Sequence, residues 1–254
     1  MLSYIAPSTV EEAVRILADA SGIAKVLSGG TDLLVQLRSG RSKPDLIVDI
    51  KKIPELSGIR ERDGAFVIGA ATPGAVIGEC EALQRFWPGV VEAANLIGST
   101  QVQGRASLAG NLCNASPAAD SVPALIAARA TCVVAGANGR REVPVESIPT
   151  GPGRTSLVVG VGVSVTRDPG GVCTDARVVL GAVAPTAILV PEAAAALIGR
   201  TLDATALAGL DQAARRACKP IDDKRGTIEY RTKVAGVMAR RAAAIAYERA
   251  GVHR

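Results

Sequence analysis

Apolar residues follow a helical period in some stretches of the chain and alternate with polar residues in others. Near the start, Val10, Val14 and Leu17 share one helical face, and Ser8 and Thr9 ahead of them are typical N-cap residues. Similar patterns predict helices at 33–38, 90–97, 117–129, 191–198, 204–217 and 229–249, and one that starts at Thr72-Pro73. They predict strands at 24–27, 46–50, 65–68, 131–135, 141–145, 161–165 and 172–183.

Turn residues divide these elements into hairpins and loops. Asn138-Gly139 lies between two predicted strands, and the Asp-Pro-Gly-Gly sequence at 168–171 lies between two more, as in antiparallel hairpins. Glycine and proline at 151–154 mark a loop and a candidate subdomain boundary. Because helices are mixed with antiparallel hairpins, we expect an α+β fold rather than a regular parallel wind.

Composition excludes several classes of protein. The 254 residues are 48% hydrophobic and 21% charged, which is typical of a globular protein. The aromatic content of 2% argues against aromatic platforms for nucleic-acid bases. One histidine, His253, and five scattered cysteines make a zinc site, an iron–sulfur cluster or a histidine-dependent hydrolase within this chain unexpected. The start resembles no secretion signal, so we expect a cytoplasmic protein without a membrane span.

A first candidate site follows the predicted strand at 24–27. Gly29 and Gly30 allow a turn whose backbone N–H groups converge on an anion, and Thr31 adds a hydroxyl donor ahead of a helix start. Lys25 precedes the turn as a weaker polar candidate, with a surface lysine as the alternative. A tight turn capped by Thr31 or Asp32 explains the same residues, and a lone glycine turn favours that simpler interpretation.

A second candidate site lies near the middle of the chain. Small, hydroxyl and amide residues crowd into 107–120, which suits a backbone surface pressed against a polar ligand. Asp120 is expected one turn into the following helix, where its carboxylate can accept hydrogen bonds from a ligand. A loop followed by a capped helix is an equally good interpretation. Neither candidate site matches the Walker A or Gly-x-Gly-x-x-Gly motif.

Together the two segments, residues 27–33 and 101–120, resemble the FAD-binding medium subunit of the molybdenum hydroxylase family, which includes carbon monoxide and xanthine dehydrogenases. Segments at 49–59, 68–72, 182–185 and 223–231 match that family in the same order. The resemblance implies an α+β fold with a two-part FAD-binding domain of the vanillyl-alcohol-oxidase (PCMH) type at 1–157. Its lobes would cover about 1–52 and 53–157, and a smaller C-terminal α/β domain would cover 158–254.

The resemblance also implies the cofactor and its contacts. Backbone N–H groups of both segments would hold the FAD pyrophosphate. No catalytic residue and no metal ligand is expected in this chain. The implied FAD-binding residues are Lys25, Leu27, Ser28, Gly29, Gly30, Thr31, Asp32, Ser107, Leu108, Ala109, Gly110, Asn111 and Asp120.

The implied function is electron transfer. The chain would take electrons from iron–sulfur clusters and pass them to an external acceptor. A large partner subunit would carry the molybdenum cofactor and a small one the 2Fe–2S clusters, in a dimer of heterotrimers. One alternative is a stand-alone FAD oxidoreductase. Another is a basic nucleic-acid-binding module, since the net charge is +5, although its arginines (Arg225, Arg231, Arg240 and Arg241 among them) are spread out and aromatics are few.

Three departures from the family pattern stand out. Ala109 replaces a usual glycine, so either its backbone adopts a conformation that alanine tolerates or the loop is shifted. Gln103-Gly104 replaces a usual Arg-Asn. At the junction of residues 157 and 158 the family has several tens more residues, including a strand. Either this chain lacks that piece, or the protein contains a further stretch there. Deleting a central strand would expose its apolar neighbours, so we favour the second alternative, which an intact mass of 25.9 kDa would refute.

Overall fold

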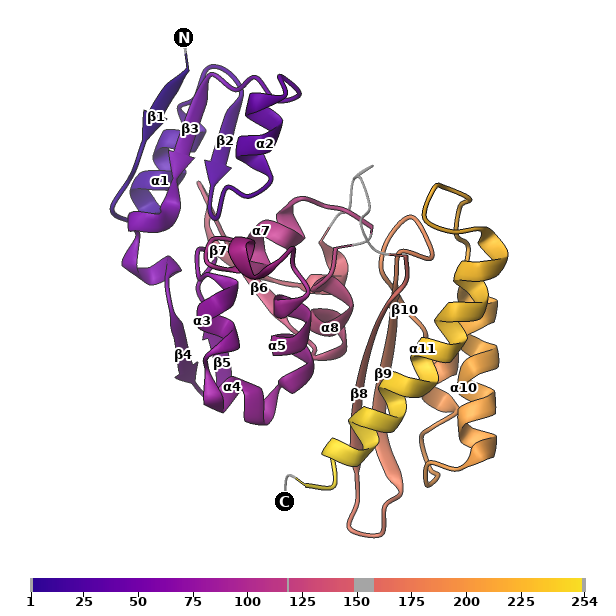
Figure 1. Ribbon diagram of the computed structural model, residues 1–254. Helices are drawn as coiled ribbons and strands as arrows, with labels where there is room; N and C mark the ends of the chain where they lie inside the picture. The colour runs from indigo at the N-terminus through magenta and orange to yellow at the C-terminus, as the bar shows by residue number, and fades with distance from the viewer. Residues whose placement is uncertain (1, 118, 149–157, 253–254) are drawn as a thin grey trace. The chain divides into compact units, whose positions relative to one another are not determined.

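The computed structural model describes residues 2–117, 119–148 and 158–252, and the chain divides into two compact units (Figure 1). The first unit contains Met1–Cys113 and Cys132–Val143. The second unit contains Asn114–Thr131 and Pro144–Arg254. The chain therefore leaves the first unit after Cys113, returns to it at Cys132, and leaves it again after Val143.

The first unit begins with a small parallel sheet in the order β1 (Ser3–Ile5), β3 (Leu46–Asp49), β2 (Ala24–Leu27). Parallel strands need crossover connections, which α1 (Val10–Ala18) and α2 (Leu33–Arg38) provide. The Thr9 hydroxyl caps α1 by accepting the Glu12 N–H, as its sequence predicts. Val10 and Ala13 of this helix pack with Val48 of β3 in one apolar cluster.

Short elements complete the first unit. The paired strands are β4 (Ile59–Arg62) with β5 (Ala65–Ile68) and β6 (Thr131–Gly136) with β7 (Gly139–Pro144). Two single-turn 3-10 helices are η1 (Ile50–Lys52) and η2 (Pro54–Leu56). The α-helices are α3 (Gly74–Gly78), α4 (Glu81–Phe86), α5 (Pro88–Asn95), α6 (Thr100–Gln103) and α7 (Leu108–Cys113). Arg140 of β7 pairs with Glu11 and Glu55, and so ties its hairpin to this unit.

The second unit is built on an antiparallel sheet. Its strand order is β10 (Ile188–Leu189), β9 (Cys173–Gly181), β8 (Gly160–Arg167). Its helices are α8 (Val122–Ala127), η3 (Val145–Ser147), α9 (Pro191–Ala195), α10 (Ala204–Ala217) and α11 (Ile228–Arg249).

Small side chains let the helices of the second unit pack closely. Ala235, Ala239 and Ala243 of α11 are fully buried at a spacing of four residues, in one cluster with Val178 and Leu180 of β9. Gly162 of β8 is needed for packing against the start of α8, because a Cβ atom there would lie 2.3 Å from the Pro123 carbonyl oxygen.

Arg231 is buried inside the second unit, with 2% of its surface exposed. Its guanidinium donates to the carbonyl oxygens of Val158 (3.0 Å) and Ala182 (3.1 Å) and to Asp223 Oδ1 (2.6 Å). An arginine so enclosed cannot face nucleic acid, and the suggestion that it could do so is wrong.

Several predicted elements agree with the structure, and two predicted helix starts differ from it. The strands at 24–27 and 65–68 and the helices at 33–38 and 204–217 are confirmed. The helix predicted at 117–129 is shorter, since α8 begins only at Val122. Thr72 is not a cap, because its hydroxyl donates to the Gly58 carbonyl oxygen and α3 begins at Gly74. The strands β1, β4 and β10 were not anticipated from the sequence.

The mixture of helices, one parallel sheet and antiparallel strands agrees with the predicted α+β class. The domain limits at 157 and 158 and the two lobes of the first domain stay predictions, and the junction after Leu157 lies outside the described residues. None of the helices in the described ranges is long and apolar enough to cross a bilayer.

Candidate functional site

The two candidate segments meet within the first unit. Ser28, directly after β2, and Ser107, directly before α7, bring their Oγ atoms to 2.9 Å. The Ser28 hydroxyl donates to the Ala70 carbonyl oxygen (3.0 Å), so the hydrogen between the two serines comes from Ser107. The Ser107 Oγ in turn accepts the Gly110 N–H (3.1 Å). A chain of hydrogen bonds therefore joins segments that are 79 residues apart in the sequence.

Gly29 lies directly against the backbone of the second segment. A Cβ atom at this position would come within 1.9 Å of the Arg105 carbonyl oxygen, so only glycine permits the approach. Gly30 has a φ of +80°, in the region that favours glycine. Both glycines of the predicted turn are thus required by the backbone geometry.

Several backbone N–H groups remain available around this contact. Among the described residues, no backbone carbonyl accepts from Gly29, Gly30 or Thr31. Leu108 and Ala109 open α7, where N–H groups have no partner one turn earlier. Such N–H groups at a turn and at a helix start favour an anionic ligand.

The second segment contains a helix over Leu108–Cys113, so the interpretation of this stretch as a loop ahead of a capped helix is wrong. Ser107 caps α7, and its carbonyl accepts the Asn111 N–H (3.0 Å) while its hydroxyl accepts that of Gly110. The N–H groups of Gly110 and Asn111 are therefore used inside the helix. Ala109 lies within α7, and alanine has the highest intrinsic helix propensity, which explains how the chain tolerates it in place of glycine.

The remaining predicted site residues differ in their placement. Lys25 is exposed on β2, and Leu27 is buried at the end of that strand. Asp32 makes no capping bond to α2 and instead accepts from the Gln36 amide (2.6 Å), so the simple capping interpretation fails for its side chain. Asp120 belongs to the second unit and lies before α8, not one turn into it. Burial raises the pKa of its carboxyl above the ordinary value.

A buried network beside the first turn was missed from the sequence. Asp49 ends β3 with 6% of its surface exposed and accepts from Tyr4 Oη (2.6 Å) and Lys51 Nζ (2.8 Å). Lys51 Nζ also donates to the Ser28 carbonyl oxygen (3.2 Å). The available signal was the polar Asp49 after three apolar strand residues, since neighbouring parallel strands end at the same edge of a sheet.

The network predicts a pH dependence of stability. Burial alone would raise the pKa of Asp49, but the hydrogen bonds from Lys51 and Tyr4 outweigh it and hold the pKa below its usual value. A lowered pKa stabilises the folded state above the unfolded value, and this stabilisation is lost as pH falls through the folded value.

We therefore expect Asp49→Asn to lower the urea midpoint at pH 7, and we expect the gap to the unsubstituted chain to shrink below about pH 4, near the ordinary pKa of aspartate. Urea titrations of both proteins at neutral and acidic pH measure this gap. A gap that is constant or grows in acid would contradict the assigned role of the carboxylate.

A second prediction concerns the cap of α7. Ser107→Ala removes the acceptor of the Gly110 N–H and the link to Ser28, and we expect it to destabilise the protein by about 1–2 kcal/mol. Urea unfolding of the full chain measures the loss. Ser99→Ala is the matched control, because Ser99 occupies the N-cap of α6 without a side-chain capping bond. Equal losses in the two variants would show that Ser107 does not act as described.

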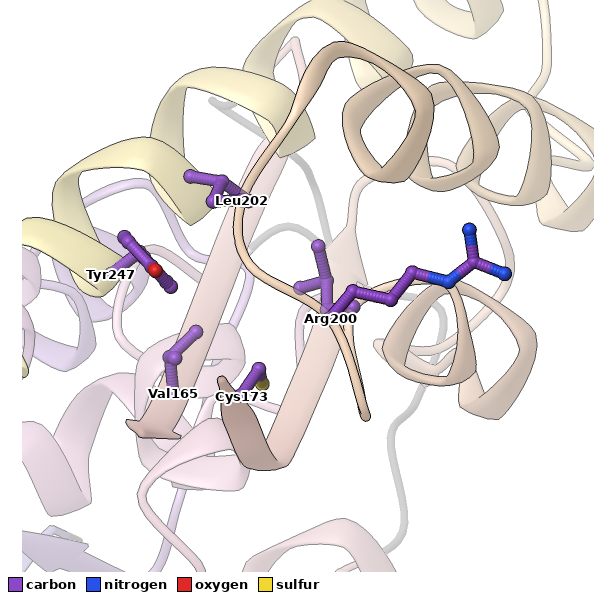
Figure 2. A pocket seen from close by; sticks show the side chains of 6 residues that line it. Val165, Cys173, Arg200, Leu202 and Tyr247 are labelled. Carbon is purple, nitrogen blue, oxygen red and sulfur yellow. The ribbon is translucent and has the colours of Figure 1, made fainter. Parts of the chain in front are cut away.

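The second unit has a small hollow between strand, loop and helix residues (Figure 2). Most of its lining is apolar, and the guanidinium of Arg200 extends away from Tyr247. The Tyr247 hydroxyl donates to the Gly171 carbonyl oxygen and is not offered to a ligand. The hollow therefore presents no arrangement for chemistry. Its lining residues are Val165, Cys173, Leu197, Arg200, Leu202 and Tyr247.

Two family models match the chain. The model for the FAD binding domain in molybdopterin dehydrogenase matches residues 1–164. The model for the CO dehydrogenase flavoprotein C-terminal domain matches residues 156–246. The first match includes both segments that meet at Ser28 and Ser107.

Known relatives match over nearly their whole length. The carbon monoxide dehydrogenase medium chain of Hydrogenophaga pseudoflava is 32% identical over 278 residues, covering 97% of each chain. The 6-hydroxypseudooxynicotine dehydrogenase complex subunit alpha of Paenarthrobacter nicotinovorans is 30% identical over 280 residues, covering 97% of this chain and 95% of its own. Both alignments are longer than this chain, so the relatives contain residues within the aligned region that have no counterpart here.

A solved structure agrees with these matches. A chain of the Hydrogenophaga pseudoflava carbon monoxide dehydrogenase that lacks the molybdenum-pyranopterin moiety has a TM-score of 0.88 and 32% identity, with 98% of each chain covered. The expected resemblance is thereby confirmed. This chain belongs to the FAD-binding medium subunits of the molybdenum hydroxylases, a family of oxidoreductases.

Proposed function

We propose that this chain is the electron-transfer subunit of a molybdenum hydroxylase. It receives electrons from the iron–sulfur clusters of a small partner subunit and passes them to an external acceptor, while a large partner subunit holds the molybdenum cofactor. The assembly is a dimer of heterotrimers in the cytoplasm. The assembly is supported by the names of two relatives, one a medium chain and the other a complex subunit. The cytoplasmic location is supported by the five cysteines, which are all free thiols.

One observation carries the proposal: the turn after β2 and the start of α7 form a single cradle in the first unit. Its available N–H groups belong to Gly29 and Gly30 on one side and to Leu108 and Ala109 on the other. Two phosphate groups joined by one oxygen need donors on two sides, and a cradle built from two segments offers them. The residues present therefore fit an FAD diphosphate.

The chain's own residues bind and orient the cofactor. The N–H groups of Gly29 and Gly30 would hold one phosphate, and those of Leu108 and Ala109 the other. The exposed Thr31 hydroxyl can add a donor to the first phosphate. Leu27 and Ser107 are buried and would support the two segments that bind the cofactor. The predicted contacts of Lys25, Asp32 and Asp120 remain part of the proposal. Gly110 and Asn111 also remain part of it, but through groups other than their backbone N–H groups, which are bonded inside α7.

The bound flavin would supply the redox chemistry by accepting electrons singly and releasing them in pairs, while the protein supplies position and electrostatics. The domain division at 157 and 158 belongs to the same proposal. It is supported by the two family matches, which overlap at residues 156–164.

Recognition of the diphosphate can be tested with two flavins. The full chain is freed of flavin and titrated with FAD and with FMN, which has a single phosphate and no adenosine. We expect FAD to bind at least about a hundredfold more tightly, because each tenfold corresponds to about 1.4 kcal/mol and FMN loses the contacts of one side. Equal affinities, or no FAD binding, would refute the proposed cradle.

Assembly can be tested by purification from the native organism through a tag on this chain. We expect two further chains, with molybdenum and iron in constant ratio to the flavin. A yellow chain that purifies alone and whose flavin is reduced by a substrate without partners would instead support a stand-alone oxidoreductase.

A further inference from the structure

Resting on the proposed function, we propose that Lys51 is a positioning residue for the cofactor. Lys51 is held by Asp49, which Tyr4 holds in turn. It fixes the carbonyl of Ser28 and thereby points the N–H of Gly29 at the FAD diphosphate. Nothing in the sequence pattern of the turn itself indicates this role.

The contacts form a continuous relay. Tyr4 Oη donates to Asp49 Oδ2 (2.6 Å), and Lys51 Nζ donates to Asp49 Oδ1 (2.8 Å). The backbone N–H of Lys51 donates to the same Oδ1 (3.0 Å). Lys51 Nζ then donates to the Ser28 carbonyl oxygen (3.2 Å). Both carboxylate oxygens of Asp49 are occupied, and the ammonium group is held between a carboxylate and the turn.

The parallel sheet brings the relay to the turn. In the register of β2 and β3, Leu27 lies opposite Asp49, so the residue after Leu27 begins the turn beside the end of β3. β1 pairs with the other edge of β3, and there Tyr4 of β1 lies opposite Ile47 of β3. Since side chains two residues apart share a face, Tyr4 and Asp49 point to the same side of the sheet.

Peptide planarity converts this contact into an orientation. The carbonyl of Ser28 and the N–H of Gly29 belong to one trans peptide unit, in which the C=O and N–H bonds point in opposite directions. A carbonyl turned toward Lys51 therefore turns the Gly29 N–H away from it. Among the described residues, no backbone carbonyl accepts that N–H.

The turn needs such an anchor because of its composition. Two successive glycines can adopt many backbone conformations and would not hold one peptide plane by themselves. The contact of Gly29 with the Arg105 carbonyl excludes a side chain but supplies no hydrogen bond. Lys51 supplies the directional contact on the opposite end of the same peptide unit.

A rival explanation is that Lys51 attracts the diphosphate directly by its charge. The two explanations differ in the sign of one effect. Asp49→Asn removes a negative charge near the anion site, so direct attraction predicts equal or tighter FAD binding. Positioning predicts weaker binding, because the anchor of Lys51 is weakened.

The experiment is an FAD titration of the flavin-free full chain, followed by flavin fluorescence. We expect Lys51→Met and Asp49→Asn each to weaken binding by roughly tenfold or more, which corresponds to about 1.4 kcal/mol, and Tyr4→Phe by a smaller factor. Lys52→Met is the matched control, since Lys52 is the exposed neighbour with the same charge in η1. It should bind FAD like the unsubstituted chain.

A second readout separates positioning from general loss of structure. Phosphorus NMR of bound FAD should show shifted diphosphate resonances in Lys51→Met at saturating FAD, and Lys51→Arg should restore both affinity and resonances. Thermal unfolding identifies any variant that fails to fold. If Lys51→Met or Asp49→Asn fails to fold, the inference is tested by the FAD affinities of Tyr4→Phe, which should be weaker, and of Lys51→Arg, which should be unchanged. Unchanged affinity in Lys51→Met, or equal or tighter binding in Asp49→Asn, would overturn the inference. Failure of the unsubstituted chain to bind FAD would overturn the proposed function instead.

Discussion

Replacing Gly29 with alanine should abolish useful FAD binding by the full chain. The added Cβ atom would come within 1.9 Å of the Arg105 carbonyl oxygen, which belongs to the backbone and cannot rotate away. The turn and the segment before α7 would have to separate, and overpacking of this kind costs about 1–3 kcal/mol of folding stability. Since the cradle needs both segments together, we expect FAD affinity to fall by at least about a hundredfold. Fluorescence titration and urea unfolding measure the two effects.

Gly104→Ala is the control for this substitution. Gly104 precedes Arg105, has a helical φ of −64° and would place its Cβ in open space. The variant should fold and bind FAD like the unsubstituted chain. If Gly29→Ala also bound FAD normally, the close contact of the two segments would have no part in cofactor binding.

Replacing Arg231 with methionine should produce the largest loss of stability in the second unit. The guanidinium is 2% exposed and supplies hydrogen bonds to the Val158 and Ala182 carbonyl oxygens, which methionine cannot replace. A buried acceptor left without a donor costs about 1–3 kcal/mol, and two carbonyls lose their donor here, so we expect a loss of roughly 2 kcal/mol or more. Urea unfolding followed by circular dichroism measures it, and hydrogen exchange should become faster in α11.

Arg240→Met tests whether the effect is specific to burial. Arg240 lies on the same helix and pairs with Asp211 (3.3 Å), but its side chain is 46% exposed. Pairs of this kind contribute at most about 1 kcal/mol, so the variant should remain close to the unsubstituted chain. Equal losses of stability in the two variants would show that the buried hydrogen bonds of Arg231 do not stabilise the second unit.

Elements with strong local patterns could be predicted closely from the sequence. The strand at 24–27 is a short run ended by two glycines, and the helix at 33–38 ends before Gly40, whose φ is +68°. The helix at 204–217 begins behind the capping carboxylate of Asp203. Caps, apolar periods and glycine turns act within a few residues, so they can be recognised without knowledge of the rest of the chain.

Elements that depend on partners could not be predicted. β1 has only three residues, all exposed, and is a strand because it pairs with β3 more than forty positions later. The stretch at 107–113 contains a hydroxyl residue, Ser107, and a glycine, Gly110, which are equally compatible with a loop and with a capped helix. It is helical because Ser107 accepts the Gly110 N–H while its hydroxyl is held by Ser28.

The candidate site divides along the same line. The glycine pair at 29–30 and the hydroxyl residues marked the two candidate segments and the resemblance to the family, because such residue types allow a backbone to approach a diphosphate closely. The contact of Gly29 with the Arg105 carbonyl, the relay from Tyr4 through Lys51 to Ser28, and the burial of Arg231 join residues from separate parts of the chain. Packing of the whole chain brings those groups together, and no local pattern encodes such distances.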